Sequence, residues 1–182
     1  MNLYLKSLIF CNTIFVFADT LFAPLYALFV IKLGGNAQIA GILFGTRFAA
    51  TTITEFFVIR MGDRARLDEN MLKLNYIIRG FSWLFLFFHQ SLPTLFLVQV
   101  FVGIGEAFGS PAFNSLISEN LDNKKHIREW GIWGIVSNPA MAIAGLVGGF
   151  IVTLFGFPPL FFLMAILSFT AALIIQLIKK GG

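Results

Sequence analysis

Residues 18–26 read ADTLFAPLY, and residues 105–113 read GEAFGSPAF. In each stretch a carboxylate, Asp19 or Glu106, stands in an apolar run, a proline follows five residues later, and an aromatic residue comes two after that. The two acids are 87 residues apart, close to half of the 182-residue chain. A carboxylate inside a membrane span is costly and usually functional. Two in matched positions predict an internal duplication, although chance matches in helices rich in Phe and Ala would look the same.

The composition is that of an integral membrane protein. Hydrophobic residues make up 58% of the chain, and only 12% are charged, against about a quarter in a typical soluble domain. The 23 phenylalanines exceed what one small core could bury. A single cysteine, Cys11, excludes an intrachain disulfide. The first apolar run is too long for a cleavable signal peptide, and nothing in the sequence suggests nucleic-acid binding.

The hydropathy pattern predicts an all-α fold with six transmembrane helices. A helix needs about 20 apolar residues to cross the bilayer. Because the connections are short, we expect one domain over residues 1–182, with repeat one over 1–90 and repeat two over 91–182. Three spans per repeat make the repeats inverted relative to each other. The predicted spans are Leu8–Ile31, Ile39–Ile59, Met71–Phe88, Leu92–Ile117, Trp130–Phe155 and Phe157–Ile178, the last two separated at Gly156.

Basic residues indicate the orientation. Six spans place both termini on one side, and the segments on that side carry ten lysines and arginines, whereas the other side carries only Lys32. Cytoplasmic segments are enriched in these residues. We therefore expect a multi-pass protein of the cell (inner) membrane with both termini in the cytoplasm. The ten residues are Lys6, Arg60, Arg64, Arg66, Lys73, Lys124, Lys125, Arg128, Lys179 and Lys180.

The first and fourth spans each carry a polar and aromatic stripe. Residues spaced by seven lie on one face of a helix. The prolines after the two acids, Pro24 and Pro111, can kink their helices, and kinks mirrored about the midplane would suit a two-way gate. The stripe residues are Asn12, Asp19 and Tyr26 in the first span and Gln99, Glu106 and Phe113 in the fourth.

The second and third spans add the charges Arg47, Glu55 and Arg79. Together with the two acids, these residues either take part in transport or neutralise one another as structural pairs. The only histidines, His89 and His126, lie in or beside loops on opposite sides. The sequence contains no metal-ligand cluster, nucleophile elbow or phosphate loop, so we expect no enzyme, no metal and no cofactor other than a coupling proton.

Four short motifs follow one another along the chain. They are Asp63-Arg64 with Arg66 between spans two and three, Gly103 and Gly105 in span four, Gly145, Gly148 and Gly149 in span five, and Gly156-Phe157-Pro158 before span six. In this order they resemble the motifs of the major facilitator superfamily, with Ile59, Ala65 and Gln99 standing where most members have two glycines and an arginine. That fold consists of two six-helix halves, each with nested three-plus-three inverted repeats. The chain therefore resembles a single half.

The resemblance implies a secondary active transporter working by alternating access, with spans one and four lining the cavity. Asp19 and Glu106 would bind protons or a cationic substrate, since a carboxylate out of water takes up a proton more readily. Arg47 and Arg79 would pair with the acids or contact anions. Asp63 and Arg64 would hold the inner gate, and the antiporter-like fifth span favours proton-coupled export of a small amphiphilic or cationic molecule. The remaining expected cavity residues are Asn12, Phe15, Phe22, Tyr26, Gln99 and Phe113.

A lone half would expose its polar stripe to lipid, at roughly a few kcal/mol or more per carboxylate. The sequence starts with Met1 and has no long linker after the sixth span, so we expect a whole subunit. Two copies would form a parallel homodimer around one cavity, with the glycine-rich spans two and five at the interface. The alternatives are half of a heterodimeric transporter, a fragment, a channel, or a non-transporting membrane scaffold or accessory subunit.

Overall fold

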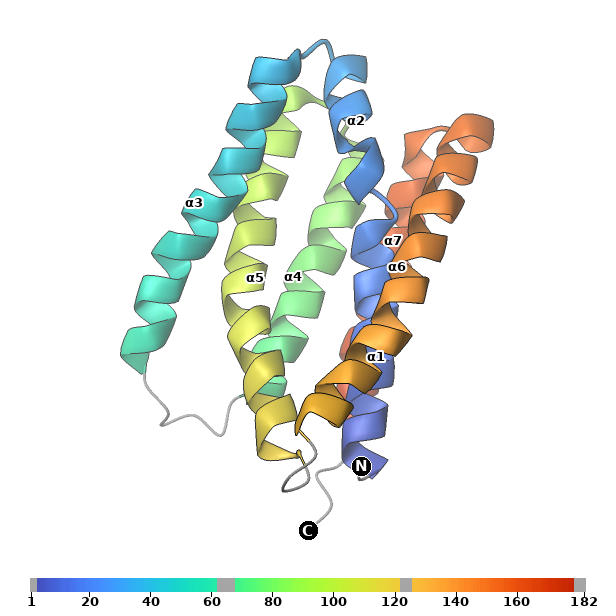
Figure 1. Ribbon diagram of the computed structural model, residues 1–182. Helices are drawn as coiled ribbons and strands as arrows, with labels where there is room; N and C mark the ends of the chain where they lie inside the picture. The colour runs from blue at the N-terminus through green and yellow to red at the C-terminus, as the bar shows by residue number, and fades with distance from the viewer. Residues whose placement is uncertain (1–2, 62–67, 122–125, 179–182) are drawn as a thin grey trace.

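The computed structural model describes residues 3–61, 68–121 and 126–178, and helices are the only regular secondary structure in them (Figure 1). Six helical segments are long and apolar enough to cross a membrane, which confirms the six predicted spans. The first span starts at Leu3, five residues earlier than predicted, and is interrupted near Pro24. The elements are α1 (Leu3–Thr20), the 3₁₀ turn η1 (Ala23–Leu25), α2 (Tyr26–Lys32), α3 (Ala37–Met61), α4 (Asp68–Phe88), α5 (Leu92–Glu119), α6 (His126–Phe155) and α7 (Phe157–Leu177).

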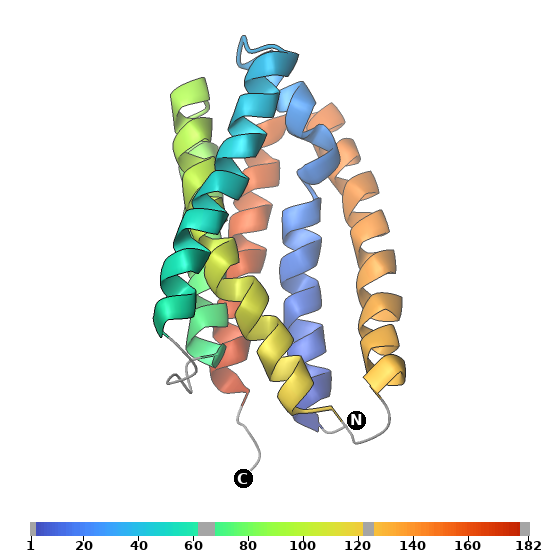
Figure 2. The same ribbon diagram turned by 60° about the vertical axis from the view of Figure 1, so that its left-hand side comes forward.

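The spans run alternately up and down the bundle (Figures 1 and 2). The start of α1 and the end of α7 consequently lie at the same end, which we call the inner end. Local sequence explains the turn between α6 and α7: Gly156 has φ = 79°, a conformation that favours glycine, and a proline follows within the first turn of α7. Ser91 begins α5 by accepting a hydrogen bond from the Thr94 amide at 3.2 Å.

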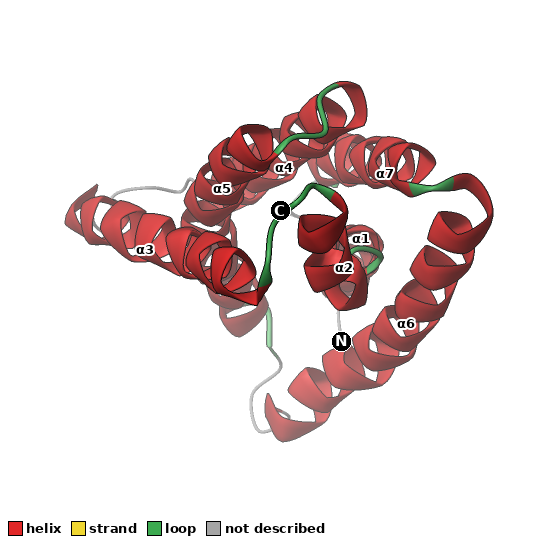
Figure 3. Cartoon of the chain, turned by 90° about the horizontal axis from the view of Figure 1, so that it is seen from above, coloured by secondary structure: helices red, strands yellow, loops and turns green. Residues whose placement is uncertain are grey.

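The packed helix pairs have an internal symmetry. Helix α4 packs on α5 and α7, α3 packs on α5, and α1 packs on α6 and α7 (Figure 3). If the first three spans are exchanged with the last three, α1 corresponds to α5, α3 to α6 and α4 to α7. This exchange maps the five pairs just named onto one another, as the predicted inverted duplication would, whereas the smaller contacts of α6 with α7 and of α2 with α3 have no comparable counterpart among the described residues.

Two hydrophobic cores fill the outer and inner halves of the bundle. The outer core gathers around Phe22, whose ring centroid is 5.9 Å from that of Trp83 and 5.2 Å from that of Phe161. The inner core includes Phe15 and Tyr76, whose ring centroids are 4.4 Å apart. Between the residues that the first span, α4 and α5 contribute to the two cores, each of these segments carries a charged residue: Asp19, Arg79 and Glu106, respectively. The flanking spans α3 and α6 are the least buried of the six (Figure 3).

Candidate functional site

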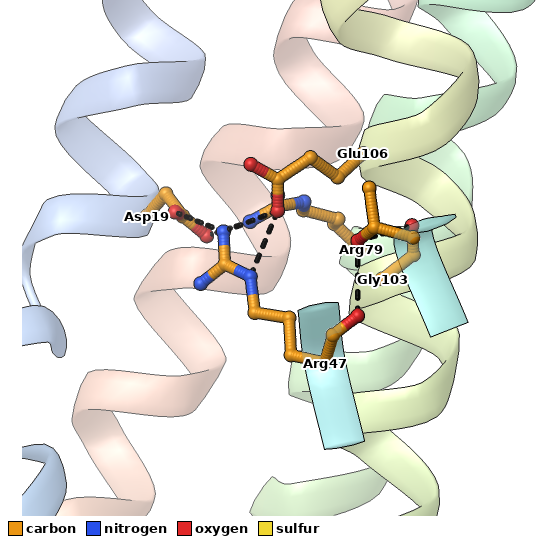
Figure 4. Close-up of polar contacts among 6 residues, drawn as sticks. Asp19, Arg47, Arg79, Gly103 and Glu106 are labelled. Atoms are coloured by element: carbon orange, nitrogen blue, oxygen red, sulfur yellow. Dashed lines mark hydrogen bonds and ion pairs between the residues drawn. The ribbon is translucent and has the colours of Figure 1, made fainter. Parts of the chain in front are cut away.

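Four charged side chains from four helices meet between the two cores (Figure 4). Arg47 of α3 places Nε and Nη2 at 2.8 Å and 2.7 Å from Glu106 Oε2 on α5. Arg79 of α4 places Nη2 3.3 Å from the same oxygen, and its Nη1 donates a hydrogen bond to Asp19 Oδ1 on α1. Arg47 Nη2 also lies 3.9 Å from Asp19 Oδ2. Each acid therefore contacts both arginines, and the formal charge of this ion cluster is zero.

The four side chains differ in burial. The Arg79 side chain is only 4% exposed, whereas those of Arg47, Asp19 and Glu106 are 24%, 26% and 30% exposed. The Arg79 guanidinium also lies over the Phe15 ring, 5.4 Å from its centroid, which adds a cation–π contact. Arg79 is thus the buried anchor of the cluster, and the other three side chains remain accessible from outside the bundle.

A close helix crossing brings Arg47 and Glu106 together. A Cβ atom on Gly103 of α5 would overlap the Arg47 carbonyl oxygen, so only glycine permits this approach. Thr51 Oγ1 donates to the Arg47 carbonyl at 2.9 Å and to the Gly103 carbonyl at 3.1 Å. Glu106 lies three residues beyond Gly103, about one helical turn, and so points toward the same region (Figure 4).

The structure brings together four of the five charged residues that the sequence singled out within the spans, and two further predicted residues lie toward the same region. Tyr26 is the first residue of α2, and its buried hydroxyl lies beside Gln99 and toward Arg47. No group in the described chain completes a hydrogen bond to this hydroxyl. These two residues therefore lie on the outer side of the ion cluster.

The other four predicted cavity residues lie in the interior, and one of them, Phe15, is the buried ring beneath the Arg79 guanidinium. Asn12 Oδ1 accepts a hydrogen bond from the Tyr76 hydroxyl at 2.7 Å, which ties α1 to α4. Phe22 is buried in the outer core, and Phe113 packs in the inner core with its ring centroid 4.9 Å from that of Trp133. These residues hold helices together. The predicted gate residues, Asp63 and Arg64, lie outside the described residues.

Sequence reasoning missed Tyr76, whose position three residues before Arg79 on α4 would have placed it next to the cluster. It grouped Glu55 with the paired charges, but this half-buried side chain forms no ion pair within the described part of the chain. Among the described residues, no three His, Cys, Asp or Glu side chains gather in a way that could hold a metal ion.

A cavity of about 490 Å³ opens between α4 and α5, away from the ion cluster. Its walls are apolar, and none of the four charged cluster residues lines it. Phe81, Phe85 and Phe101 among its lining residues are largely exposed on the outside of the bundle. In a bilayer such a surface contacts lipid chains, so the ion cluster remains the candidate site.

The fold and the site together define a multi-pass helical membrane protein with a charged layer across the middle of its bundle. The family model described as Major Facilitator Superfamily matches residues 8–180, and the chain belongs to that superfamily. No curated protein matches the chain.

Two solved structures show the same fold. "In meso crystal structure of the POT family transporter PepTSo" is similar over 96% of this chain with a TM-score of 0.81 and 14% identity. "Crystal structure of auto inhibited POT family peptide transporter" is similar over 98% of this chain with a TM-score of 0.79 and 15% identity. At such identities the likeness shows the fold alone. The chain spans 37% of the length of each of these two proteins, so it corresponds to one six-helix half.

Proposed function

We propose that the chain is one half of a proton-coupled secondary transporter that works by alternating access. Membership of the superfamily supports transport, and the ion cluster supports coupling to protons. The observation that carries the proposal is that Asp19 and Glu106, one from each predicted repeat, share the same two arginines between the two cores.

The cluster can respond to a proton because its members differ in chemistry. A carboxylate can be neutralised by a proton, whereas an arginine side chain stays charged in a protein. Glu106 Oε2 receives three close guanidinium contacts, from α3 and from α4. Protonation of Glu106 would weaken all three and loosen α5 from both helices. Such a link between proton binding and helix contacts is what a two-state transporter needs.

The proposal also covers the orientation of the protein, its inner gate and its substrate. We place both termini on the cytoplasmic side of the cell (inner) membrane, on the basis of the charge bias. Asp63 and Arg64 keep the inner-gate role that the family resemblance implies. The sequence favoured export of a cationic or amphiphilic molecule, but both acids already have arginine partners, which makes the site less suited to a cation.

We further propose that a second copy supplies the other half, in a parallel homodimer. The spans α3 and α6 are the least buried, and four of their glycines, Gly41, Gly45, Gly131 and Gly149, have no neighbouring atom within 4 Å of the point where a Cβ atom would lie. By contrast, Gly103 and Gly148 meet neighbouring backbones of their own chain. Small residues without contacts in their own chain are suited to close packing against another helix.

One observation favours a second candidate function, that of a non-transporting scaffold or accessory subunit. All four cluster charges are neutralised within the chain, and ion pairs of this kind could serve only to tie four helices together. The two functions differ in whether the acids must change their protonation state during activity.

The test uses the purified protein reconstituted in proteoliposomes that contain a pH-sensitive dye. Compounds selected by thermal shift are added, and proton movement and uphill accumulation are measured. We expect accumulation in the wild type, and its loss in Asp19→Asn and in Glu106→Gln while both variants stay folded. Glu55→Gln is the matched control, because it makes the same chemical change outside the cluster. Full uphill transport by the Asp19→Asn, Glu106→Gln double variant would refute the role of the two acids in proton coupling. A wild-type protein that transports no compound would favour the scaffold function.

A further inference from the structure

We propose that the transported substrate is a small anion, with a carboxylate or a comparable oxyanion, that binds between Arg47 and Arg79 when Glu106 is protonated. This inference rests on the proposed transport function and adds the substrate class to it. It starts from an oxygen atom that already contacts both arginines.

That oxygen atom is Glu106 Oε2. Three guanidinium nitrogens from two arginines lie within 3.3 Å of this single oxygen. An oxyanion of a ligand could take over the same donors, because guanidinium groups bind carboxylate and phosphate oxygens with good geometry. The Arg47 side chain is 24% exposed, and its hydrogen bonds and ion pairs with the described residues use Nε and Nη2, not Nη1. A ligand can therefore reach Arg47 without the bundle opening at Arg79.

The charge of the cluster can change in only one direction. It holds two carboxylates and two guanidiniums, which sum to zero. A carboxylate can gain a proton, but an arginine cannot lose one under physiological conditions. Each protonation therefore makes the cluster more positive. A net positive charge between two apolar cores is costly, and an anion removes that cost.

Binding of a cation would not restore the neutral charge of the cluster in this way. It would need a free carboxylate, but Asp19 and Glu106 each contact both arginines. Arg79, with a side chain only 4% exposed, is enclosed by its neighbours and keeps its charge beside any incoming group. A cation would therefore add positive charge to a site that already holds two fixed positive groups.

The protonated state also supplies a donor. A neutral carboxylic acid has one O–H group, so protonated Glu106 could donate a hydrogen bond to the anion that has taken its place. Binding of one proton and one monovalent anion leaves the cluster charge at zero. The proposal thus predicts that the two bind together, each raising the affinity for the other.

The experiment measures binding of lactate and of inorganic phosphate to the full chain in detergent, with choline as the cationic comparison. Thermal shift and proton uptake in weakly buffered solution are recorded at acidic and at mildly alkaline pH. We expect wild-type affinity for at least one anion to fall as pH rises, by up to about tenfold per pH unit for one linked proton. Binding should be accompanied by uptake of a proton, and choline should have no effect.

Glu106→Gln fixes the neutral form of the side chain, so it should bind the anion at both pH values without proton uptake. Asp19→Asn, which gives the cluster the same net charge by a second route, guards against a folding defect in the first variant. Glu55→Gln should keep the wild-type pH dependence. Failure of both cluster variants to bind either anion, or stabilisation by choline instead, would overturn the inference. Uphill transport of a cation without anion binding would overturn it while leaving the transport function intact.

Discussion

At the scale of the residue, Arg79 should matter more for stability than Arg47. Removing one partner from a buried ion pair leaves uncompensated charge and costs about 3–5 kcal/mol. Arg79→Met should approach this loss, because its side chain is 4% exposed and both acids depend on it. Arg47→Met should lower the free energy of unfolding by less, because the Arg47 side chain is 24% exposed and water can solvate the carboxylates that lose this partner.

Chemical unfolding in detergent, followed by circular dichroism, measures both variants against the wild type. Equal losses would show that burial does not set the strength of these contacts. An unchanged Arg79→Met variant would remove the anchor role altogether.

The sequence was sufficient to predict that charges within spans pair with one another, because unpaired ones are too costly in a membrane. It could not predict which helices bring them together, since that depends on the crossing of α3 and α5 at Gly103. The seven-residue stripe likewise placed Asn12 and Phe113 on the same faces as the acids. A stripe does not distinguish a cavity wall from an interior contact, and both residues proved to lie inside the bundle.

At the scale of the element, two helix crossings correspond to each other under the exchange of the predicted repeats. Gly103 on α5 meets the Arg47 carbonyl of α3, and Gly148 on α6 meets the Leu21 carbonyl just after α1. Gly103→Ala should force α3 and α5 apart and cost about 1–3 kcal/mol, as overpacking does. Gly131→Ala is the control, with open space around the added methyl and an expected change within about 0.5 kcal/mol.

The same unfolding assay reports both glycine variants. A Gly103→Ala protein as stable as the control would mean that the crossing can relax. In that case the closeness of α3 and α5 would not be what positions Arg47 beside Glu106.

Hydropathy located all six spans, because the bilayer demands long apolar helices whatever their packing. The mirrored prolines behave differently from each other. The first span is interrupted near Pro24, where α1 gives way to a 3₁₀ turn, whereas α5 runs unbroken through Pro111. A proline removes only one helical hydrogen bond, and neighbouring helices in a membrane can compensate for it. The tertiary contacts that decide between these outcomes are not visible in the sequence.

At the scale of the whole molecule, the charge bias predicts which end faces the cytoplasm. In a Cys11→Ala background, a cysteine at the exposed Gln38 marks the outer end of α3, and one at the exposed Lys6 marks the inner end of α1. An impermeant thiol reagent applied to intact cells should label position 38 and not position 6. The reverse labelling pattern would show that the protein has the opposite orientation in the membrane, against the distribution of its basic residues.

The exposed faces of α3 and α6 each combine open glycines with large apolar side chains. In the outer half, α3 has the open glycines Gly41 and Gly45, and α6 has Leu146 and Phe150, which are 76% and 65% exposed. In the inner half, Phe56 of α3 is exposed and Gly131 of α6 is open. A two-fold axis along the membrane normal would place α3 of one copy against α6 of the other, so that large residues meet glycines at both depths.

This arrangement predicts a crosslink. In the Cys11→Ala background, Gly45→Cys combined with Leu146→Cys should form a disulfide between two copies, because α3 and α6 lie on opposite flanks of α1 and α2 within one copy (Figure 3). Leu173→Cys, exposed on α7, is the control and should give none. The transporter component of each nanodisc particle should have twice the 20.2 kDa mass of one chain. A single-chain particle that still transports would refute the homodimer, because it would show that one half can cover its own ion cluster from lipid.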